Sequence, residues 1–420
     1  MNYQVRLKRA HALIQHIADY RHEFVLAITK DVGKPIRESQ EEIASAIKEA
    51  AYIVNRSSEV LFSREVDRSG TIVNLQRLFP IGNSLVLSPY NFPVELSIWG
   101  VLSNFICGNP VFYSPSERTP CCNSLLDRAF TEHLGREAYR GIGHNSFDVY
   151  MLVRQFNIKL LWLIGSNKAA DQIREALGST ETKLIMELGG SSPCLVFESA
   201  FDKQSPREIA NFIVGSRFYN TGQVCSCIKR LYVERQAYDT LIPHLIEAAE
   251  ALEQAPPEEG RSQLGRLTDH QIAECEQLVG QACMLGAEIL TGGNKVNLGT
   301  CATYAPTLLS SCNHDMQVLY EEVFLPILPI ICFDYYEEAI SLANDTRFGL
   351  SGFCFTGDAA QAEQLIEDME VSRLLINCGK EDGIRFPIDG FKQSGNARQQ
   401  GDANYTELTR LKYIRQARPY

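Results

Sequence analysis

The feature of this sequence that most restricts its fold is an alternation of short apolar strands with amphipathic helices. Strands are predicted at residues 84–87, 111–113, 159–164 and 184–186, and segments with apolar residues at helical spacing lie between them. Repeated β–α units predict a mainly parallel sheet with helices on both faces and with ligands at the carboxyl ends of its strands. The predicted fold class is therefore α/β.

A second α/β series begins after Pro193. Strands are predicted at residues 194–197, 230–234, 327–333, 352–355 and 373–376 and near Val318. Helices are predicted between them, the longest at residues 238–252 and 268–285. The second half of the chain is therefore also expected to build a sheet covered by helices.

The two ends of the chain depart from this alternation. Residues 5–54 form three predicted helices, the third opened by a capping box from Ser39 to Glu42, and no strand precedes them. Charged and β-forming residues mix between 62 and 80, which predicts a hairpin, and residues 405–420 predict a terminal strand or arm. Because neither face of the hairpin is clearly apolar, we expect it to cover another subunit.

Length and composition limit the class of protein. The chain has 420 residues, enough for two or three domains, and its 45% apolar and 22% charged residues are typical of a globular protein. A formal net charge of −11, without a cluster of lysine or arginine, argues against nucleic-acid binding. No run approaches about 18 consecutive apolar residues and the N-terminus lacks a signal-peptide profile, so we expect a cytoplasmic protein that has no membrane partner.

The thirteen cysteines are scattered along the chain and odd in number. This usage fits free thiols in a reducing compartment better than a disulfide framework. Pairs such as Cys121 with Cys122, or Cys225 with Cys227, have no second pair at zinc-site spacing, and no histidine lies at ligand spacing from them. We therefore expect no metal site.

Cys225 lies in a loop between a predicted helix at residues 209–218 and a predicted strand at 230–234. Most of thirteen cysteines are expected to be buried and inert. A thiol on a loop can instead reach a ligand, and it attacks a carbonyl carbon when a base and donors for the oxyanion stand beside it. Two other segments supply such groups.

Glu187 and Asn91 are the candidate partners of Cys225. Glu187 sits among apolar residues at the end of a predicted strand, so partial desolvation should raise its pKa toward the range of a base that activates water. Asn91 lies where a strand meets a helix, and its amide can stabilise an oxyanion together with the backbone N–H of Cys225. With a sheet of the dinucleotide-binding type, these groups predict an aldehyde that forms a thiohemiacetal, loses hydride to a nicotinamide and is released from the thioester by water.

Gly165 and Ser166 end a predicted strand directly before a predicted helix. Backbone N–H groups at such a position can contact a pyrophosphate. A glycine after a strand is more often a simple turn, so this pair alone does not establish a nucleotide site.

These segments resemble the motifs of the aldehyde dehydrogenase superfamily, and they follow one another in that family's order. Residues 222–225 resemble its nucleophile signature, 187–190 its general-base signature and 88–93 its oxyanion loop. Other segments resemble its adenosine-ribose loop (108–111 and 115–120), its pyrophosphate turn (165–166), its nicotinamide-ribose segment (321–326) and its late motifs (344–350 and 390–395). The chain is identified as a member of this superfamily, similar to semialdehyde dehydrogenases and short at its N-terminus.

The resemblance implies a Rossmann-like cofactor domain, an α/β catalytic domain and a small β oligomerisation region. The cofactor domain would comprise residues 1–61 and 81–188, and the catalytic domain residues 189–398. The hairpin at 62–80 and the C-terminal arm at 399–420 would form the oligomerisation region, which implies a homodimer or homotetramer. The implied substrate is a small-molecule aldehyde.

The resemblance also implies a nicotinamide cofactor and the residues that bind it. These are Ser88, Pro89, Tyr90, Ser114, Glu117, Gly165, Ser166, Leu188, Gly189, Glu322 and Phe324. The carboxylate of Glu117 would accept hydrogen bonds from the adenosine ribose and would repel a 2′-phosphate. NAD is therefore expected rather than NADP.

The cofactor half departs from the family pattern at several positions. Ser114 replaces the lysine that binds the adenosine ribose, which removes a charged donor whose hydrogen bonds are worth about 1.5–3 kcal/mol. Asn167 and Leu325 replace a threonine and a glycine, and the usual Pro-Pro-Gly-Val loop is missing at residues 134–143. Since the three catalytic residues are intact, the acyl-transfer chemistry is better supported than tight NAD binding.

Three functions stay open on this basis. The first is oxidation of an aldehyde to its carboxylic acid with NAD. The second is a thioester-forming hydrolase or esterase that uses Cys225 and Glu187 without hydride transfer. The third is a catalytically impaired or non-enzymatic family member that kept the fold as an oligomeric or binding protein.

Two further residues bear on the substrate and on redox control. The pattern from Cys225 to Cys227 is similar to that of semialdehyde dehydrogenases, and Arg385 could anchor the carboxylate of such a substrate. Arg385 could equally be a solvated surface charge. Cys227 is either a small core residue or the partner of Cys225 in a reversible disulfide that silences the enzyme.

Overall fold

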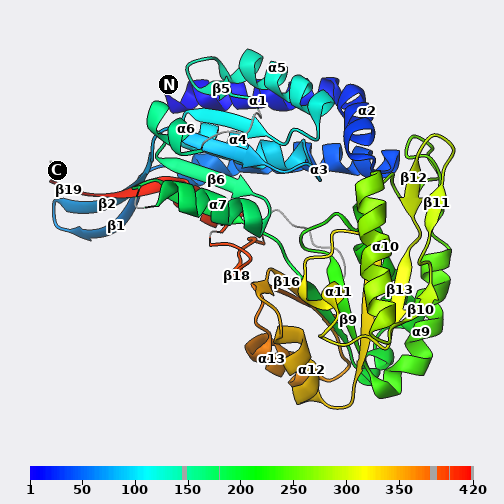
Figure 1. The fold of residues 1–420 in the computed structure, drawn as a ribbon. Coiled ribbons are helices and arrows are strands. Elements are labelled where there is room, and N and C mark those ends of the chain that lie inside the picture. The colour runs from blue at the N-terminus through cyan, green and yellow to red at the C-terminus, as the bar shows by residue number, and fades with distance from the viewer. Residues whose placement is uncertain (144–148, 179, 379–385, 397, 418–420) are drawn as a thin grey trace.

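A five-stranded parallel sheet organises the first half of the chain in the computed structural model, which describes residues 1–143, 149–178, 180–378, 386–396 and 398–417 (Figure 1). Its order is β5-β4-β3-β6-β7. The strands are β3 (Ser84–Ser88), β4 (Val111–Pro115), β5 (Tyr139–Gly141), β6 (Leu160–Ile164) and β7 (Lys183–Glu187). The predicted parallel sheet is confirmed.

Helices cover both faces of this sheet (Figure 1). One face carries α1 (Tyr3–Asp19), α2 (Arg21–Val32), α3 (Ile36–Val60), α4 (Glu95–Cys107) and α5 (Pro120–Leu134), and the other carries α6 (Val149–Gln155) and α7 (Asn167–Leu177). Successive residues of β6 alternate between the two cores, with Trp162 facing α4 and Leu161 facing α7. Gly100 lets α4 lie close to the sheet, because a Cβ there would stand 2.6 Å from Val86.

The predicted capping box is wrong. Helix α3 begins at Ile36, with Pro35 as its N-cap, so Ser39 and Glu42 lie inside the helix. Tertiary contacts use both side chains instead: Ser39 shares a hydrogen bond of 2.8 Å with Thr29, and Glu42 accepts one of 2.7 Å from Lys34. The local sequence resembles a helix start. Because Ser39 and Glu42 are buried, however, their side chains bond to Thr29 and Lys34 and not to the backbone of a first helical turn.

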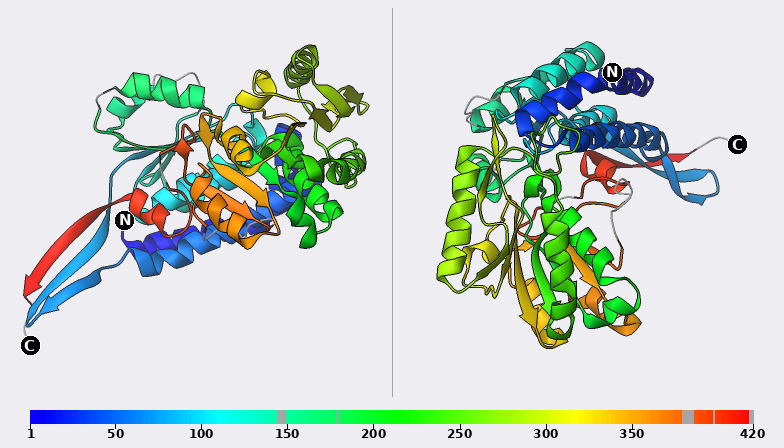
Figure 2. Two further views of the ribbon diagram at one scale, coloured as in Figure 1. Left: turned by 90° about the horizontal axis from the view of Figure 1, so that it is seen from below. Right: turned by 90° about the vertical axis from the view of Figure 1, so that its right-hand side faces the viewer.

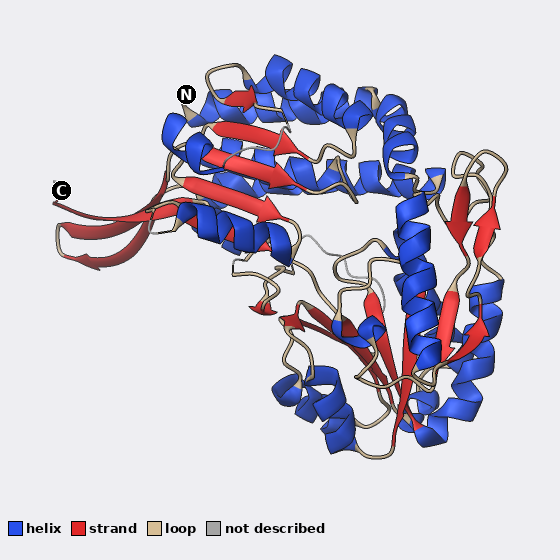
Figure 3. Cartoon of the chain, viewed as in Figure 1, coloured by secondary structure: helices blue, strands red, loops and turns tan. Residues whose placement is uncertain are grey.

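The second half of the chain builds a second sheet, which lies below the first in Figure 3. It has seven strands in the order β10-β13-β14-β9-β8-β16-β17. Its strands are β8 (Ser192–Val196), β9 (Ile228–Glu234), β10 (Glu288–Thr291), β13 (Thr307–Ser310), β14 (Ile327–Phe333), β16 (Ser351–Phe355) and β17 (Arg373–Ile376). All neighbours are parallel except β10, which runs antiparallel to β13. The second predicted α/β unit is therefore present.

The helices of this half also form two layers. Helices α8 (Pro206–Phe218) and α9 (Arg235–Glu250) pack on one face of the sheet. The other face carries α10 (Asp269–Met284), α11 (Gln317–Tyr320), α12 (Tyr336–Asn344) and α13 (Ala359–Asp368). The strand predicted near Val318 is wrong, because this residue lies in α11, and so short an apolar segment has no period by which to tell a helix from a strand.

A third sheet projects from the rest of the molecule (Figure 2). Strands β1 (Arg64–Ser69) and β2 (Ile72–Pro80) form the predicted hairpin, and β19 (Thr409–Ala417) pairs antiparallel with β2 along its whole length. Every residue of β1 is exposed. Helix α14 (Ala403–Glu407) leads into β19, and two-stranded pairs are formed by β11 (Lys295–Asn297) with β12 (Ala302–Tyr304) and by β15 (Phe348–Gly349) with β18 (Phe391–Lys392).

Membrane-spanning segments were also sought. None of the helices in the described ranges is long and apolar enough to cross a bilayer.

Candidate active site

A strained turn presents Cys225. Helix α8 ends at Phe218, and the chain is kinked over the next residues, where Asn220, Thr221 and Gly222 have left-handed φ values of 48°, 56° and 82°. Left-handed backbone is costly for residues other than glycine. At Gly222 a side chain is also excluded by space, because a Cβ would lie 2.6 Å from the carbonyl oxygen of Leu325. The turn therefore reverses the chain between α8 and β9 and leaves the thiol on the connecting loop.

Hydrogen bonds join this loop to the segment that carries Asn91. Nδ2 of Asn91 donates to the carbonyl oxygen of Gln223 over 3.0 Å, and Nδ2 of Asn220 donates to the carbonyl oxygen of Asn91 over 3.0 Å. The backbone N–H of Asn220 donates to Glu38 on α3. Asn91 is 4% exposed and fixed beside the Cys225 loop, and its amide has a second N–H for a ligand.

Cys225 and Glu187 lie in contact where β7 ends and the chain enters β9. The thiol of Cys225 donates to Oε1 of Glu187 over 3.4 Å, and Glu187 is 2% exposed. Gly190 permits this approach, since a Cβ there would stand 2.8 Å from the carbonyl oxygen of Cys225. The structure thus brings together the nucleophile and the base expected from the sequence.

Burial changes the acidity of both groups. Burial raises the pKa of Glu187 to about 7, against the opposing effects of the Cys225 hydrogen bond and of the Arg373 charge. Burial, followed by the negative charge of Glu187, raises the pKa of the Cys225 thiol well above its usual value. The resting pair is therefore a neutral thiol beside a carboxyl group that titrates near neutral pH.

Lys229 is a residue of this site that the sequence analysis missed. Its side chain is 1% exposed, and Nζ donates to the carbonyl oxygens of Val224 and Cys225 over 2.8 and 2.7 Å. Its charge favours ionisation of the Cys225 thiol. A basic residue four positions after the cysteine was the available signal, but only the fold turns it back beneath the loop.

Cys225 and Glu187 open into a cavity of about 560 Å³. Its walls come from α3, α4, α8, the Cys225 loop, β16 and β17, and from residues that precede α14. Aromatic side chains in the wall are Phe92, Trp99, Phe212, Tyr219 and Phe353, and carboxylates are Glu41, Glu42, Glu49, Glu95 and Glu187. A volume of this size suits a small-molecule substrate.

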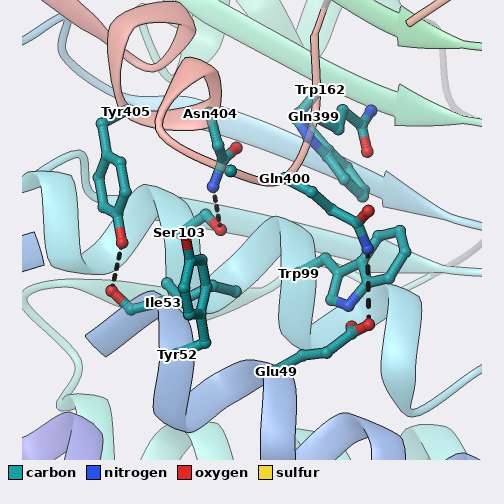
Figure 4. Close-up of a pocket in the computed structure, with 11 residues that line it drawn as sticks. Glu49, Tyr52, Ile53, Trp99, Ser103, Trp162, Gln399, Gln400, Asn404 and Tyr405 are labelled. Carbon is teal, nitrogen blue, oxygen red and sulfur yellow. Dashed lines mark hydrogen bonds between the residues drawn. The ribbon is translucent and has the colours of Figure 1, made fainter. Parts of the chain in front are cut away.

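A much smaller cavity of about 20 Å³ lies beside the large one (Figure 4). Glu49, Trp99 and Gln400 line both cavities. Asn404 donates to Ser103 over 2.8 Å, which holds the C-terminal segment against α4. The end of the chain therefore closes one side of the large cavity.

Two other cavities lie near the carboxyl ends of the five-stranded sheet, where a dinucleotide is expected. One of about 310 Å³ is bounded by Tyr113, Pro115 and Gly141 at the ends of β4 and β5. The other, of about 370 Å³, is bounded by Tyr90 and Phe324. Both positions agree with the rule that ligands of parallel sheets bind at the carboxyl ends of the strands.

The predicted cofactor residues have differing surroundings. The hydroxyl of Ser114 donates to the carbonyl oxygen of Gly143 over 2.7 Å, and the following Glu117 is exposed. Ser166 caps α7, since its side chain accepts from the N–H of Ala169, and Gly165 precedes it at the end of β6. The hydroxyl of Ser114 is therefore already hydrogen-bonded within the protein, whereas the carboxylate of Glu117 is exposed to solvent.

The nearby Ser88-Pro89-Tyr90 segment is also tied to the protein itself. The hydroxyl of Ser88 lies 2.9 Å from that of Ser97 and 3.2 Å from that of Tyr113. Tyr90 donates to Oε1 of Gln223 over 2.9 Å, and the guanidinium of Arg118 lies 3.4 Å from the centre of its ring. Tyr90 therefore connects the proposed cofactor site to the Cys225 loop.

Glu322 lies against the turn that follows β7. The N–H of Leu188 donates to the carbonyl oxygen of Ser394, and Glu322 accepts from the N–H of Gly190 over 3.1 Å. Glu322 also lies 3.5 Å from Nζ of Lys229, while a Cβ on Gly189 would stand 2.1 Å from its carboxylate. A side chain at position 189 would therefore force the carboxylate of Glu322 to move. Phe324 lies beside Tyr90, with 6.5 Å between the ring centres.

Cys227 is a packed side chain in this structure and is not joined to Cys225 by a disulfide. It is 4% exposed, and its sulfur accepts from the guanidinium of Arg217 over 3.1 Å and lies 3.2 Å from the carbonyl oxygen of Val224. All thirteen cysteines are free thiols in this structure. Arg385, the other residue considered for the substrate, lies outside the described residues.

One group of possible metal ligands occurs in the described part of the chain. Ligand atoms of His16, Glu132 and His133 lie within 4.8 Å of one another between α1 and α5. These residues do not line the cavity of Cys225. The absence of a metal site stays a prediction.

Known proteins share this sequence and fold. The model of the Aldehyde dehydrogenase family matches residues 1–414. A mitochondrial succinate-semialdehyde dehydrogenase of Oryza sativa subsp. japonica is 28% identical over 417 residues, covering 97% of this chain and 76% of the relative. A betaine aldehyde dehydrogenase of Vibrio vulnificus is 27% identical over 410 residues, with 95% and 82% covered.

Solved structures agree with these sequence relatives. The aldehyde dehydrogenase KauB of Pseudomonas aeruginosa superimposes with a TM-score of 0.93 at 25% identity, covering 99% of this chain and 85% of its own. Lactaldehyde dehydrogenase of Escherichia coli does so with a TM-score of 0.92 at 25% identity, covering 100% and 87%. With its two sheets, the contact of Cys225 with the buried Glu187 and a family match over nearly its full length, this chain belongs to the aldehyde dehydrogenase family.

Proposed function

We propose that this protein oxidises an aldehyde to the carboxylic acid with Cys225 as nucleophile, Glu187 as base and Asn91 as oxyanion donor. The observation that carries the proposal is the contact of 3.4 Å between Sγ of Cys225 and Oε1 of Glu187 on the wall of a substrate-sized cavity. A thiol in contact with a buried carboxyl group whose pKa is near 7 provides both groups that covalent acyl transfer needs.

The first step is attack of Sγ on the carbonyl carbon. Because the thiol is neutral at rest, its proton passes to Glu187 as the S–C bond forms. The carbonyl oxygen then carries negative charge, and it accepts hydrogen bonds from the second N–H of Asn91 and from the backbone N–H of Cys225. The ammonium of Lys229, held under the loop, also favours the thiolate.

A bound NAD would supply the hydride acceptor for the thiohemiacetal carbon, and Tyr90, Glu117 and Glu322 are among the residues that would hold it. The carbon is then a thioester of Cys225. Glu187, after losing its proton to solvent, takes a proton from water, and the resulting hydroxide attacks the thioester. The carboxylic acid leaves, and the thiol regains its proton.

The described residues fit a dinucleotide, though with fewer charged donors than the family pattern. The cavities near β5 and beside Tyr90 provide space at the two ends of such a molecule, and the N-terminus of α7 provides backbone N–H groups for a pyrophosphate. Glu117 and Glu322 would hold the two riboses. We propose NAD rather than NADP because the exposed carboxylate of Glu117 would repel a 2′-phosphate.

A homodimer or homotetramer is proposed from the projecting sheet. Its outer residues include large apolar side chains that face solvent in one protomer, with Val66 58% and Tyr413 75% exposed. A three-stranded sheet with so little burial gains stability when another subunit covers it. Light scattering of the intact protein tests this assembly. A cytoplasmic location stays a prediction from the thirteen free cysteines.

The function is tested by following NADH absorbance with NAD and a panel of aldehydes. Cys225→Ala should abolish NADH formation, whereas Cys378→Ala, which removes an exposed cysteine, should not. Absence of NADH together with absence of an NAD-dependent thermal shift would exclude the dehydrogenase. Turnover of p-nitrophenyl esters that requires Cys225 would then favour the esterase, and its absence a non-enzymatic role.

A further inference from the structure

Two histidines meet where helices α1 and α5 pack against each other, away from the cavity of Cys225 (Figure 1). On α1, His16 lies one turn after the fully buried Leu13, and on α5, His133 lies one turn after the fully buried Phe130. Helical spacing therefore turns both imidazoles into the contact between the helices. Their rings meet edge to face, with 4.8 Å between ring centres.

Each imidazole has a nitrogen that is enclosed without a partner. His16 is 9% exposed, and Nε2 of His16 and Nε2 of His133 are both buried and make no hydrogen bond within the described ranges. The ring of His16 stacks on Tyr20 with 4.5 Å between ring centres, which fixes its orientation. A buried polar nitrogen without a partner costs free energy. Two such nitrogens at one helix contact point to a ligand that both can bind.

Glu132 adds a carboxylate to this pair. Its Oε1 lies 3.9 Å from Nε2 of His133, too far for a hydrogen bond, and ligand atoms of all three residues lie within 4.8 Å of one another. Atoms that bind one zinc-sized ion at about 2.1 Å stand roughly 3.4 Å apart in a tetrahedron, so these atoms need to approach by at most about 1.4 Å. Side-chain rotation supplies such a shift, most easily at the exposed Glu132.

The electrostatic surroundings favour a positive ion at this place. Both histidines lie in the last turns of their helices, and the C-terminal ends of helices carry partial negative charge. Glu132 and Asp19 add negative charges that act on His16. Arg128 opposes them, but its guanidinium lies 3.7 Å from the carboxylate of Glu23. The carboxylates and the helix ends together therefore outweigh this arginine.

We propose that His16, His133 and Glu132 bind a divalent transition-metal ion that joins α1 to α5. Two imidazoles and one carboxylate suit ions such as Zn²⁺ and Ni²⁺, with water in the positions that remain. The ion would fix α5, whose first half borders the cavity at the ends of β4 and β5. The site would also correct the expectation of no metal, which rested on cysteine spacing and not on histidines from two helices.

Calorimetric titration with Ni²⁺ tests the site, with protein that carries no histidine tag. Ni²⁺ is the probe because imidazole suits it, whereas Zn²⁺ also binds the thiolates of free cysteines. We expect one ion per chain. His16→Gln and His133→Gln should each weaken binding at least about 10- to 100-fold, since removing even an outer partner of a ligand costs that much. His11→Gln, which changes an exposed histidine of α1, should bind as the intact protein does.

Two measurements separate loss of the ligand from loss of the fold. Glu132→Gln changes an exposed side chain, so it should leave the melting temperature of the metal-free protein unchanged and still weaken Ni²⁺ binding. Ni²⁺ should raise the melting temperature of the intact protein and of His11→Gln, because an ion that binds only the folded chain stabilises it. It should not raise that of His16→Gln or His133→Gln.

X-ray absorption at the nickel edge identifies the atoms that hold the ion. Imidazole nitrogen and carboxylate oxygen are the expected neighbours. A sulfur neighbour, or binding that disappears in Cys225→Ala, would place the ion on a thiol and overturn the proposal. Absence of binding would also overturn it, as would glutamine variants of His16 and His133 that bind as tightly as the intact protein. These outcomes do not depend on the proposed oxidation, because the three ligands do not line the cavity of Cys225.

Discussion

Replacing Glu187 by glutamine separates two effects that this carboxylate has on Cys225. As a base, Glu187 accepts protons from the thiol and from water. As a charge, it makes the thiol harder to ionise, second only to burial among the causes that raise the thiol pKa. The glutamine keeps the shape of the side chain and removes both effects, so turnover should fall while the reactivity of the thiol should not.

The size of the turnover effect follows from the role of general base. Losing such a group costs about 10²–10⁴ in rate. The loss should fall mostly on hydrolysis of the thioester, because without the charge of Glu187 the thiol ionises more easily and can give its proton to solvent. The thioester should then accumulate, which gives a rapid burst of about one NADH per active site before slow turnover. Alkylation of Cys225 by iodoacetamide should be no slower than in the unmodified protein, because the opposing charge is gone.

The pH dependence gives an independent measure. Only the ionised carboxylate accepts a proton, and the pKa of Glu187 is raised to about 7. Turnover of the unmodified protein should therefore fall about tenfold per pH unit as the pH drops below 7, and this dependence should vanish in the glutamine variant. Glu367→Gln, which changes an exposed carboxylate of α13, is the control. Alkylation that slows as much as turnover, or a reaction without a burst, would refute the reasoning.

Three other substitutions test the framework of the site. Lys229→Gln removes two buried charged hydrogen bonds of about 1.5–3 kcal/mol each, so it should lower the melting temperature and slow alkylation of the thiol at neutral pH. Gly222→Ala should destabilise the fold by at least about 1–2 kcal/mol in urea titrations, because φ is 82° there, whereas Gly260→Ala, in open space, should change little. Lys34→Met should cost about 3–5 kcal/mol of unfolding free energy, since it leaves a buried carboxylate unpaired; an unchanged denaturation midpoint would contradict this account.

The sequence predicted the parts of the site that depend on local chemistry. Glu187 ends a strand directly before two glycines, Cys225 lies on a loop after Gly222, and Asn91 lies where a strand gives way to a helix. The contact between Cys225 and Glu187 agrees with that placement. The strands were predictable because short apolar runs alternate with helical periodicity. These signals lie within a few residues and need no knowledge of the fold.

Other features depend on contacts between distant segments, which local patterns do not contain. Glu49 and Glu95 belong to two helices, and nothing in either helix indicates that their carboxyl groups meet beside the thiol. In the sequence, Lys229 is one charged residue at the start of a strand. Only the fold places its ammonium under the Cys225 loop. Ser39 failed as a helix cap for the same reason, because a tertiary partner on α2 competed with the backbone.

The position of the C-terminal segment has a consequence for how the protein is made. Tyr405 bonds to the carbonyl group of Ile53, Asp402 to Arg56 and Gln400 to Glu49, and these partners are separated by 352, 346 and 351 residues. At about 5–20 residues per second, a ribosome needs roughly 20–70 s to complete that interval. Throughout this time the β1–β2 hairpin lacks its third strand, β19. The edge of β2 with which β19 pairs is then free and can pair with other nascent chains. Chaperone demand and yield should therefore depend more on the last twenty residues than on the catalytic loop.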